Sequence, residues 1–361
     1  MTVFAVAPST QPATRSARAA RYHGVLDVRI EQIEIAEPTA DEVLVEVAFC
    51  GVCGSDLHEY FSGQTVTPAE PHPLTHVELP VVLGHEFSGT VAAVGPDVRS
   101  VAVGDRVAVR PTYSCGECAS CERGHPNTCT KLAFHGLSGP GGGLSTFTVL
   151  PSSMVFALPG NVTLEQGALV EPMAVSYHAV ALGITDATVV AFVGEAGPIG
   201  IGAIFALRAR GIRHVIAADL SPARRALAAS LGAEVFDPAE RSLVDVLEGR
   251  VLDLAVEAAG VGAVVTAAIE AMGPRGRLVL VGLHEKPVRL DPTSCSTARP
   301  QSSAPPRTPM TTTAQSSRRW PRGGYDPSGW VETRPLDELS STFDELRAGG
   351  PSKVLIELNT P

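Results

Sequence analysis

Hydrophobic and polar positions alternate along the first part of the chain. Between Val25 and about Leu158, short alternating runs such as Val43–Ala48 and Gly89–Val94 are separated by glycine, proline and aspartate. A period of two residues is the pattern of a strand with one buried face, and these residue types form the turns between strands. This part of the chain is therefore predicted to be β-rich. The next segment, Leu164–Leu182, lacks the alternation and is predicted to be helical.

The pattern changes from Thr188 onward. Short apolar runs now alternate with longer stretches that have the character of helices. Strands that alternate with helices predict parallel βαβ units and a doubly wound sheet. The predicted strands are Val189–Val193, His214–Ala218, Leu252–Glu257 and Arg277–Val281, and the predicted helices are Ile199–Arg210, Ala223–Leu231 and Ala263–Met272.

A third kind of sequence covers Thr293–Gly324. Serine, threonine, proline and arginine dominate it, and it has almost no apolar periodicity. Such a composition cannot bury a core, so we expect this segment to be disordered or misfolded. After it, Leu336–Leu346 is predicted to be a helix and Lys353–Leu358 a strand.

Length and composition fit two domains of ordinary size. The chain has 361 residues, of which 44% are hydrophobic, enough for two cores. The formal net charge of −10 argues against a nucleic-acid partner. No apolar run is long enough to predict a membrane span, and Met1–Arg21 lacks the apolar core of a signal peptide. We therefore expect a cytoplasmic protein that has no membrane partner.

Four cysteines lie close together, and they share the spacing C-x2-C-x2-C-x7-C: Cys115, Cys118, Cys121 and Cys129. Four thiolates in one short stretch form the ligand set of a tetrahedral zinc site. Disulfides or free thiols are the alternatives, and metal is favoured because no secretory signal is visible. A closed site of this kind leaves no position for a substrate. Its zinc is therefore predicted to hold a loop rather than to catalyse.

A second group of possible metal ligands is spread along the chain. Cys53 precedes Gly84-His85-Glu86, and Glu171-Pro172-Met173 follows much later. A thiolate, an imidazole and a carboxylate would leave a fourth zinc position open, which is the layout of a catalytic site. Because these groups lie far apart in sequence, their spacing leaves open that they are only packed or surface residues.

A glycine-rich turn lies between a predicted strand and a predicted helix. It covers Val193–Gly200, and Asp219 ends the next strand. The pyrophosphate of a dinucleotide binds at such a helix start, and an acid at the end of the second strand binds the ribose hydroxyls. The alternative is a tight turn that binds nothing. The succession of strand, turn, helix, strand and terminal acid favours the dinucleotide.

Together these motifs resemble the zinc-dependent medium-chain dehydrogenases, and within them the 2,3-butanediol and sorbitol dehydrogenase branch. The resemblance covers roughly Ala19–Pro292 and Tyr325–Leu358. Besides the cysteine cluster, it depends on the stretches CGSDLHEY at Cys53–Tyr60, LGHEFSG at Leu83–Gly89, VGDRV at Val103–Val107, EPMAVSYHA at Glu171–Ala179 and AGPIG at Ala196–Gly200.

The resemblance implies a fold in two parts. A GroES-like β-barrel catalytic domain would span residues 17–165, and residues 325–361 would return to it. A Rossmann domain that binds NAD would span residues 166–292, and residues 293–324 would be an atypical segment between the two. The family also implies a homo-oligomer, either a dimer or a tetramer.

The resemblance also assigns the metal and proton-transfer residues. Two zinc ions per chain are implied, one structural in the four-cysteine cluster and one catalytic. Cys53, His85 and Glu171 would be the protein ligands of the catalytic zinc. Glu86 would be the neighbouring acid that approaches this metal directly or through water. Ser55 and His58 would carry the proton of the substrate hydroxyl to solvent.

The implied cofactor is NAD, and the implied substrate is a small alcohol or ketone. Asp219 would repel the 2′-phosphate of NADP, although Arg224 and Arg225 follow closely. The segments Phe61–Pro80 and Phe134–Phe147 look most like the branch that acts on vicinal diols and hydroxyketones. A polyol such as sorbitol, or L-threonine, is the alternative substrate. The implied cofactor residues are Gly194, Gly197, Pro198, Ile199, Gly200, Asp219 and Arg224.

The sequence departs from the family pattern at three places, and two of these could affect catalytic activity. Glu195 stands where the family has glycine, so its side chain should strain the turn and bring negative charge towards the pyrophosphate. We therefore expect weaker NAD binding than in a Glu195→Gly variant. Thr293–Gly324 replaces apolar strands, which two compensating frameshifts or a linker insertion would explain. As written, this segment is expected to cost dimerisation or stability, and a catalytically impaired relative is therefore an alternative. The leader Met1–Ser16 has no counterpart in the family.

Overall fold

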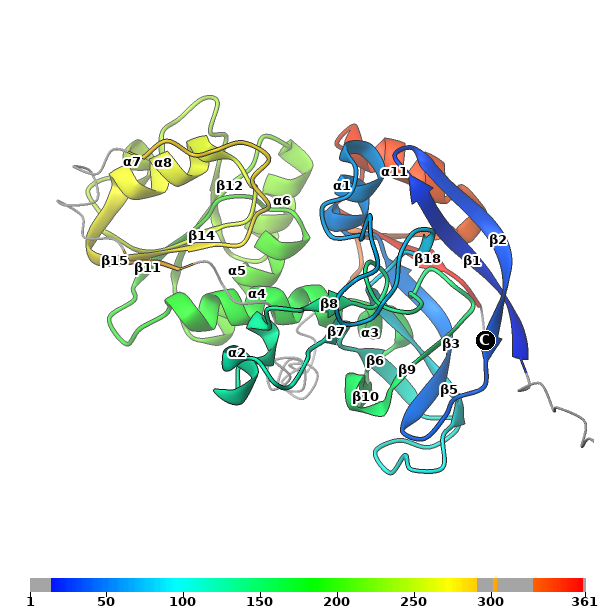
Figure 1. Cartoon of the computed structure of the whole chain (residues 1–361). Coiled ribbons are helices and arrows are strands. Elements are labelled where there is room, and N and C mark those ends of the chain that lie inside the picture. The colour runs from blue at the N-terminus through cyan, green and yellow to red at the C-terminus, as the bar shows by residue number, and fades with distance from the viewer. Residues whose placement is uncertain (1–13, 291–300, 304–326, 360–361) are drawn as a thin grey trace, which may run out of the picture.

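The structure, a computed structural model, describes residues 14–290, 301–303 and 327–359. These residues form two domains that lie side by side (Figure 1). The β-rich domain holds the blue and red ends of the chain, and the other holds the green and yellow middle. None of the helices in these ranges is long and apolar enough to cross a membrane.

The first domain is built around a seven-stranded sheet, as the alternating pattern predicts. Its strand order is β10-β6-β5-β3-β18-β17, and β9 also pairs with β3. Three further strands, in the order β2-β1-β4, form a second sheet. The strands are β1 Thr14–Gly24, β2 Asp27–Ala36, β3 Glu42–Gly51, β4 Val81–Val82, β5 Glu86–Val94, β6 Arg106–Val109, β7 Thr112–Tyr113, β8 Ala133–Phe134, β9 Phe147–Pro151, β10 Val155–Ala157, β17 Val331–Pro335 and β18 Lys353–Glu357.

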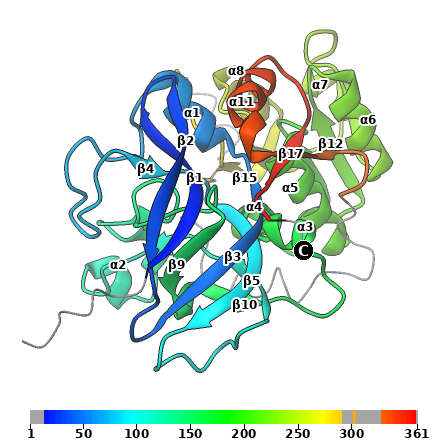
Figure 2. The same ribbon diagram turned by 90° about the vertical axis from the view of Figure 1, so that its right-hand side faces the viewer.

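The C-terminal segment completes this first domain. β18 pairs antiparallel with β3, opposing Ile356 to Cys50. The helix α11 (Leu339–Arg347) places Phe343 in the core, where its ring lies 5.0 Å from that of Tyr60 in α1 (Gly54–Ser62). Figure 2 shows α11 beside α1 at one end of the domain. Chain ends that are remote in sequence therefore share one core.

The second domain has a six-stranded parallel sheet in the order β13-β12-β11-β14-β15-β16. The chain runs outward from β11 through β12 to β13 and then crosses to β14 on the other side. The carboxyl ends of β11 and β14 thus form the point where the strand order reverses, which is where open α/β sheets bind ligands. The strands are β11 Val190–Val193, β12 His214–Ala218, β13 Glu234–Phe236, β14 Leu252–Glu257, β15 Met272–Leu280 and β16 Gln301–Ser303.

Helices connect these parallel strands, as βαβ units require. Nearly every residue of β11 and β12 is buried, because the helices pack their apolar faces on the sheet. The helix α4 packs against α5 and extends from the second domain towards the first (Figure 1). The helices of this half are α3 Leu164–Ala168, α4 Val170–Gly183, α5 Pro198–Ala209, α6 Pro222–Ser230, α7 Leu243–Leu247 and α8 Gly262–Ala271.

Most predicted elements are confirmed, and the errors have physical causes. The run His214–Ala218 is the strand β12, and the helix predicted over Leu164–Leu182 is divided at Leu169 into α3 and α4. The short elements β13 and α7 were missed because three to five residues carry too little periodicity. The strand β15 begins at Met272, where a helix end was predicted.

Two further expectations concern the chain segments outside the predicted domains. The leader was expected to reach Ser16, but β1 begins at Thr14, which pairs with Ala36. Within the atypical segment, Gln301–Ser303 form a strand that pairs with β15. A ladder of backbone hydrogen bonds does not require apolar side chains. The rest of Thr293–Gly324, and with it the frameshift hypothesis, lies outside the described residues.

Replacing Phe343 tests whether the C-terminal segment belongs to the first core. Phe343→Ala should lower the free energy of unfolding by about 3–5 kcal/mol, because it leaves a cavity at a fully buried ring. Urea unfolding followed by circular dichroism measures the change. Phe343→Leu, the control, keeps most of the apolar volume and should lose clearly less. An unchanged midpoint for Phe343→Ala would contradict this packing.

Candidate active site

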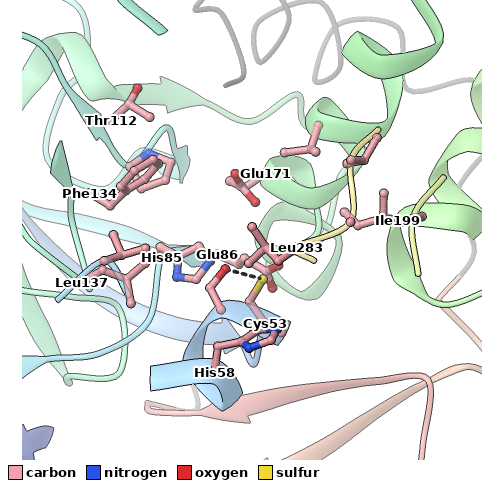
Figure 3. Close-up of a pocket in the computed structure, with 18 of the residues that line it drawn as sticks. Cys53, His58, His85, Glu86, Thr112, Phe134, Leu137, Glu171, Ile199 and Leu283 are labelled. Carbon is pink, nitrogen blue, oxygen red and sulfur yellow. Dashed lines mark hydrogen bonds between the residues drawn. The ribbon is translucent and has the colours of Figure 1, made fainter. Parts of the chain in front are cut away.

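A cavity of about 420 Å³ lies between the two domains. The first domain contributes Cys53, His85 and Phe134 to its wall, and the second contributes Ile199 and Leu283. Figure 3 shows these side chains converging from opposite sides on one space. The second domain reaches this space from the turns that follow β11, β14 and β15. The cavity thus lies at the ligand-binding edge of the parallel sheet.

Three potential metal ligands meet in this cavity: Cys53, His85 and Glu86. Their ligand atoms all lie within 4.8 Å of one another. Cys53 is the N-cap residue of α1, and the two others stand at the start of β5, next to α1 in Figure 3. One thiolate, one imidazole and one carboxylate at this separation fit a zinc ion with an open position.

Asp56 supports two of these ligands, and its role was missed from the sequence. Its Oδ2 accepts a hydrogen bond from the backbone N–H of Cys53 at 2.9 Å. Its Oδ1 lies 3.6 Å from Nδ1 of His85, and within the described residues neither atom has a hydrogen-bond partner. Burial alone would lower the pKa of His85, but Asp56 and Cys53 raise it well above its usual value. A carboxylate behind a ligating imidazole is typical of metal sites. The position of Asp56 inside the CGSDLH stretch could have suggested it.

Lys353 is the second residue that sequence analysis missed. Its ammonium group forms a buried ion pair with Glu86 and donates to the carbonyl oxygen of Val52 at 2.9 Å. Burial lowers the pKa of Lys353, but the Glu86 carboxylate outweighs this effect and holds the pKa above its usual value. No local signal marks this lysine, because it arrives from the last strand of the chain.

Glu171 lies apart from the three-residue ligand group, although it was predicted to be the third ligand. It stands in the first turn of α4 and lines the same cavity (Figure 3). Burial, with the nearby Glu86 carboxylate, raises its pKa to about 7. The structure therefore groups Glu86, rather than Glu171, with Cys53 and His85. Ligation by Glu171 stays a prediction.

The two residues expected to move protons both line the cavity. The hydroxyl of Ser55 lies 3.7 Å from the sulfur of Cys53. Nδ1 of His58 lies 3.3 Å from a carboxylate oxygen of Glu285, which belongs to the second domain and is half exposed. Ser55 thus lies beside a potential metal ligand, and His58 lies beside a half-exposed residue of the other domain. Their relay role stays a prediction.

The four clustered cysteines also come together, around the short helix α2 (Ala119–Glu122). The sulfurs of Cys129 and Cys115 are 3.4 Å apart, and those of Cys118 and Cys121 are 3.6 Å apart. A disulfide needs about 2.05 Å, whereas tetrahedral zinc–sulfur bonds of about 2.3 Å separate sulfurs by ~3.8 Å. The separations therefore fit a metal and exclude disulfides within this cluster.

Backbone N–H groups donate hydrogen bonds to sulfurs of this cysteine cluster. The sulfur of Cys129 accepts from the N–H groups of Cys115 and Lys131, both at 3.3 Å. Hydrogen bonds from the backbone of Thr130, and then of Cys121, lower the pKa of Cys118, whereas burial, and then the Cys118 side chain, raises the pKa of Cys121. Donors of this kind favour the thiolate, which is the form that binds zinc.

The glycine turn connects β11 to α5 as predicted. Gly197 is the N-cap residue and Pro198 opens the helix. A side chain at Gly200 would overlap the carbonyl oxygen of Glu195, so glycine is required there. Asp219 directly follows the strand β12, and its Oδ2 accepts a hydrogen bond from the N–H of Ala196 at 3.0 Å. The N-cap residue of this 12-residue helix makes no side-chain cap hydrogen bond, so the start of the helix suits a pyrophosphate.

The expected backbone strain at Glu195 is wrong. Glu195 is not among the residues with positive φ, so its backbone lies outside the region that favours glycine. Its carboxylate instead pairs with Nη1 of Arg224 at 2.8 Å. Burial raises the pKa of Glu195 above its usual value, and the Arg224 guanidinium opposes this shift. Only the electrostatic part of the sequence argument about Glu195 therefore remains.

Comparisons with known proteins agree with this arrangement. Residues 39–160 match the family model of the alcohol dehydrogenase GroES-like domain, and residues 198–301 match that of the zinc-binding dehydrogenases. The first match includes the potential metal ligands Cys53, His85 and Glu86 and the four-cysteine cluster. The second begins at Pro198, the first residue of α5, inside the glycine-rich segment Val193–Gly200.

Relatives and a solved structure are similar over most of the chain. The chain is 40% identical to an (R,R)-butanediol dehydrogenase of Bacillus subtilis, over 76% of this chain and 80% of the relative. It is 33% identical to a sorbitol dehydrogenase of the same organism, over 76% and 77%. The crystal structure of 2R,3R-butanediol dehydrogenase from Bacillus subtilis superposes with a TM-score of 0.86 at 35% identity, over 95% of this chain and 100% of that one. The chain belongs to the zinc-dependent medium-chain dehydrogenase family.

Proposed function

We propose that the protein transfers a hydride between NAD and a vicinal diol or its hydroxyketone, such as 2,3-butanediol and acetoin. One observation carries the proposal: a single cavity joins the Cys53–His85–Glu86 group to the dinucleotide turn at Glu195 and Ile199. A hydroxyl bound at the first group would thus lie in the same cavity as the cofactor. The butanediol dehydrogenase relative supports the choice of substrate.

Zinc would be held at two places in the chain. Cys53, His85 and Glu86 would hold one ion, with Glu171 close enough to the same cavity to take part. The four-cysteine cluster would hold the other. When bound in the cavity, zinc supplies Lewis acidity that lowers the pKa of the substrate hydroxyl.

Ser55 and His58 would carry the released proton. Ser55 lies beside Cys53, so its hydroxyl is placed to accept a proton from a bound substrate and to donate its own onward. His58 is partly exposed and next to the half-exposed Glu285, so it can pass the proton to water. Lys353 and Asp56 would position Glu86 and His85 during this transfer without contacting the substrate.

Apolar side chains favour a small substrate that carries alkyl groups. Val66, Phe134, Leu137, Val281 and Leu283 all line the cavity. Methyl groups on a vicinal diol would pack against these side chains, whereas polyol hydroxyls that faced them would be left without hydrogen-bond partners. The sorbitol dehydrogenase relative keeps a polyol as the second candidate substrate, with L-threonine as a further alternative.

Assembly and cellular setting are also part of the proposal. A homo-oligomer, dimer or tetramer, would use the edge of the second sheet, where β16 is the outermost described strand. Because β16 lies inside the atypical segment, that segment is expected to cost dimerisation. The clustered thiols need a reducing compartment, which supports the cytoplasm.

A substrate panel tests the proposed activity. We expect NAD reduction with 2,3-butanediol to have a kcat/KM at least about 10-fold above that with sorbitol or L-threonine, because the latter two leave polar groups unpaired against the apolar wall. Spectrophotometric NADH formation measures it. A preference for sorbitol would establish the polyol alternative. A protein that binds zinc and NADH but turns over none of the three would be a catalytically impaired relative.

Zinc content tests the two metal sites separately. The purified protein should contain two zinc ions per chain, and Cys53→Ser and Cys118→Ser should each contain one, because each removes a thiolate from a different cluster. Elemental analysis of the folded protein measures the ratio. Cys50→Ser is the matched control, since Cys50 belongs to neither cluster, and it should keep both ions. Two ions in Cys118→Ser would contradict the structural site.

A further inference from the structure

The dinucleotide turn carries an ion pair that the family pattern does not include. Glu195 lines the cavity, and its carboxylate lies 2.8 Å from Nη1 of Arg224, the third residue of α6. The carboxylate also lies over the start of α5, because an added Cβ at Gly197 would stand 3.0 Å from Oε1 of Glu195. A negative charge and its cation are therefore fixed where the cofactor would pass.

Asp219, the residue expected to bind the ribose, lies next to the ion pair of Glu195 and Arg224. Nη1 of Arg224 lies 3.9 Å from Oδ2 of Asp219. Asp219 itself is held in place by the N–H groups of Ala196 at 3.0 Å and Ser221 at 2.8 Å. An acid at the end of the second strand binds the ribose hydroxyls of NAD, and an arginine beside that position accommodates the 2′-phosphate of NADP. Arg224 stands in the place of such an arginine, but it is already paired.

The neighbouring arginine is paired as well. Nη1 of Arg225 lies 2.9 Å from Asp237 and donates to the carbonyl oxygens of Asp219 and Leu220. Glu257, another carboxylate behind the turn, is paired with His284 at 3.1 Å. Among the described residues around Asp219, each arginine of the α6 start thus has a carboxylate partner.

We propose that Glu195 is a specificity-determining residue that makes the site selective for NAD over NADP. It withdraws Arg224 from the 2′ position and adds a second negative charge beside Asp219. Two carboxylates and one guanidinium leave the local charge negative, which disfavours a phosphate monoester that carries about −1.5 to −2 at neutral pH. NAD carries only a neutral hydroxyl at the 2′ position, so the carboxylates do not repel it. The inference rests on the proposed NAD-dependent function.

Charge rather than volume is responsible in this view. Glu195→Gln keeps the size of the side chain and removes its charge, so Arg224 becomes available for a 2′-phosphate. Removing the guanidinium as well, in Glu195→Gln with Arg224→Gln, should abolish that gain. Glu234→Gln is the matched control, because Glu234 pairs with Arg250 at the same 2.8 Å separation but does not line the cavity.

Titration of NADH and NADPH, followed by the fluorescence of the bound reduced nicotinamide, tests the proposal on the full chain. In the unaltered protein NADPH should bind more weakly than NADH. In Glu195→Gln the ratio of the two dissociation constants should move toward NADPH by roughly 10-fold or more, the scale of one partly buried ion pair. The double variant and Glu234→Gln should keep the original ratio.

Several results would overturn the inference. An unchanged ratio in Glu195→Gln, or equal tightening of both cofactors, would mean that Glu195 acts on the pyrophosphate or not at all. Equal affinities in the unaltered protein would also exclude it, while leaving the dehydrogenase function intact. If no variant binds either dinucleotide, the proposed function fails together with the inference. Circular dichroism of each variant excludes unfolding as the cause.

Discussion

The buried ion pair between Lys353 and Glu86 is the interaction on which the site depends. It joins the last strand of the chain to the residue that stands among the metal ligands, and both side chains are almost completely buried. A charge buried without its partner is strongly destabilising, so neither residue can be lost alone without cost. Because β18 pairs with β3 directly before Cys53, the same strand that completes the core also sets the geometry of the cavity.

The cavity forms where the two domains contact each other, and both contribute to its wall. The β-rich domain supplies groups that suit a metal, and the parallel sheet supplies the turns that suit a dinucleotide. Neither domain encloses the space by itself. Glu285 of the second domain, which approaches His58 of the first, extends this contact to the expected proton path. The chemistry of the family is therefore a property of the boundary between the domains.

Much of this arrangement could be predicted from local sequence. Three motifs are each confined to one short stretch of chain: the four cysteines, CGSDLHEY and the glycine turn. The spacing of residues within each stretch therefore predicts what it binds. Strands such as His214–Ala218 could be predicted because four consecutive buried apolar residues, Val215–Ala218, are typical of a strand inside a parallel sheet. Glu195 was recognised as unusual, but the expected backbone strain was wrong because the turn gives it an ordinary φ and an arginine partner.

Short motifs were enough to predict the family, the two-domain fold, two cysteine-containing metal sites and the position of the dinucleotide turn. Tertiary structure alone decided that Glu86 rather than Glu171 groups with Cys53 and His85, that Lys353 neutralises it, and that Arg224 is engaged by Glu195. The physical reason is distance along the chain. Local motifs are held by neighbouring backbone, whereas the pairing of buried charges depends on which remote segments the core brings together.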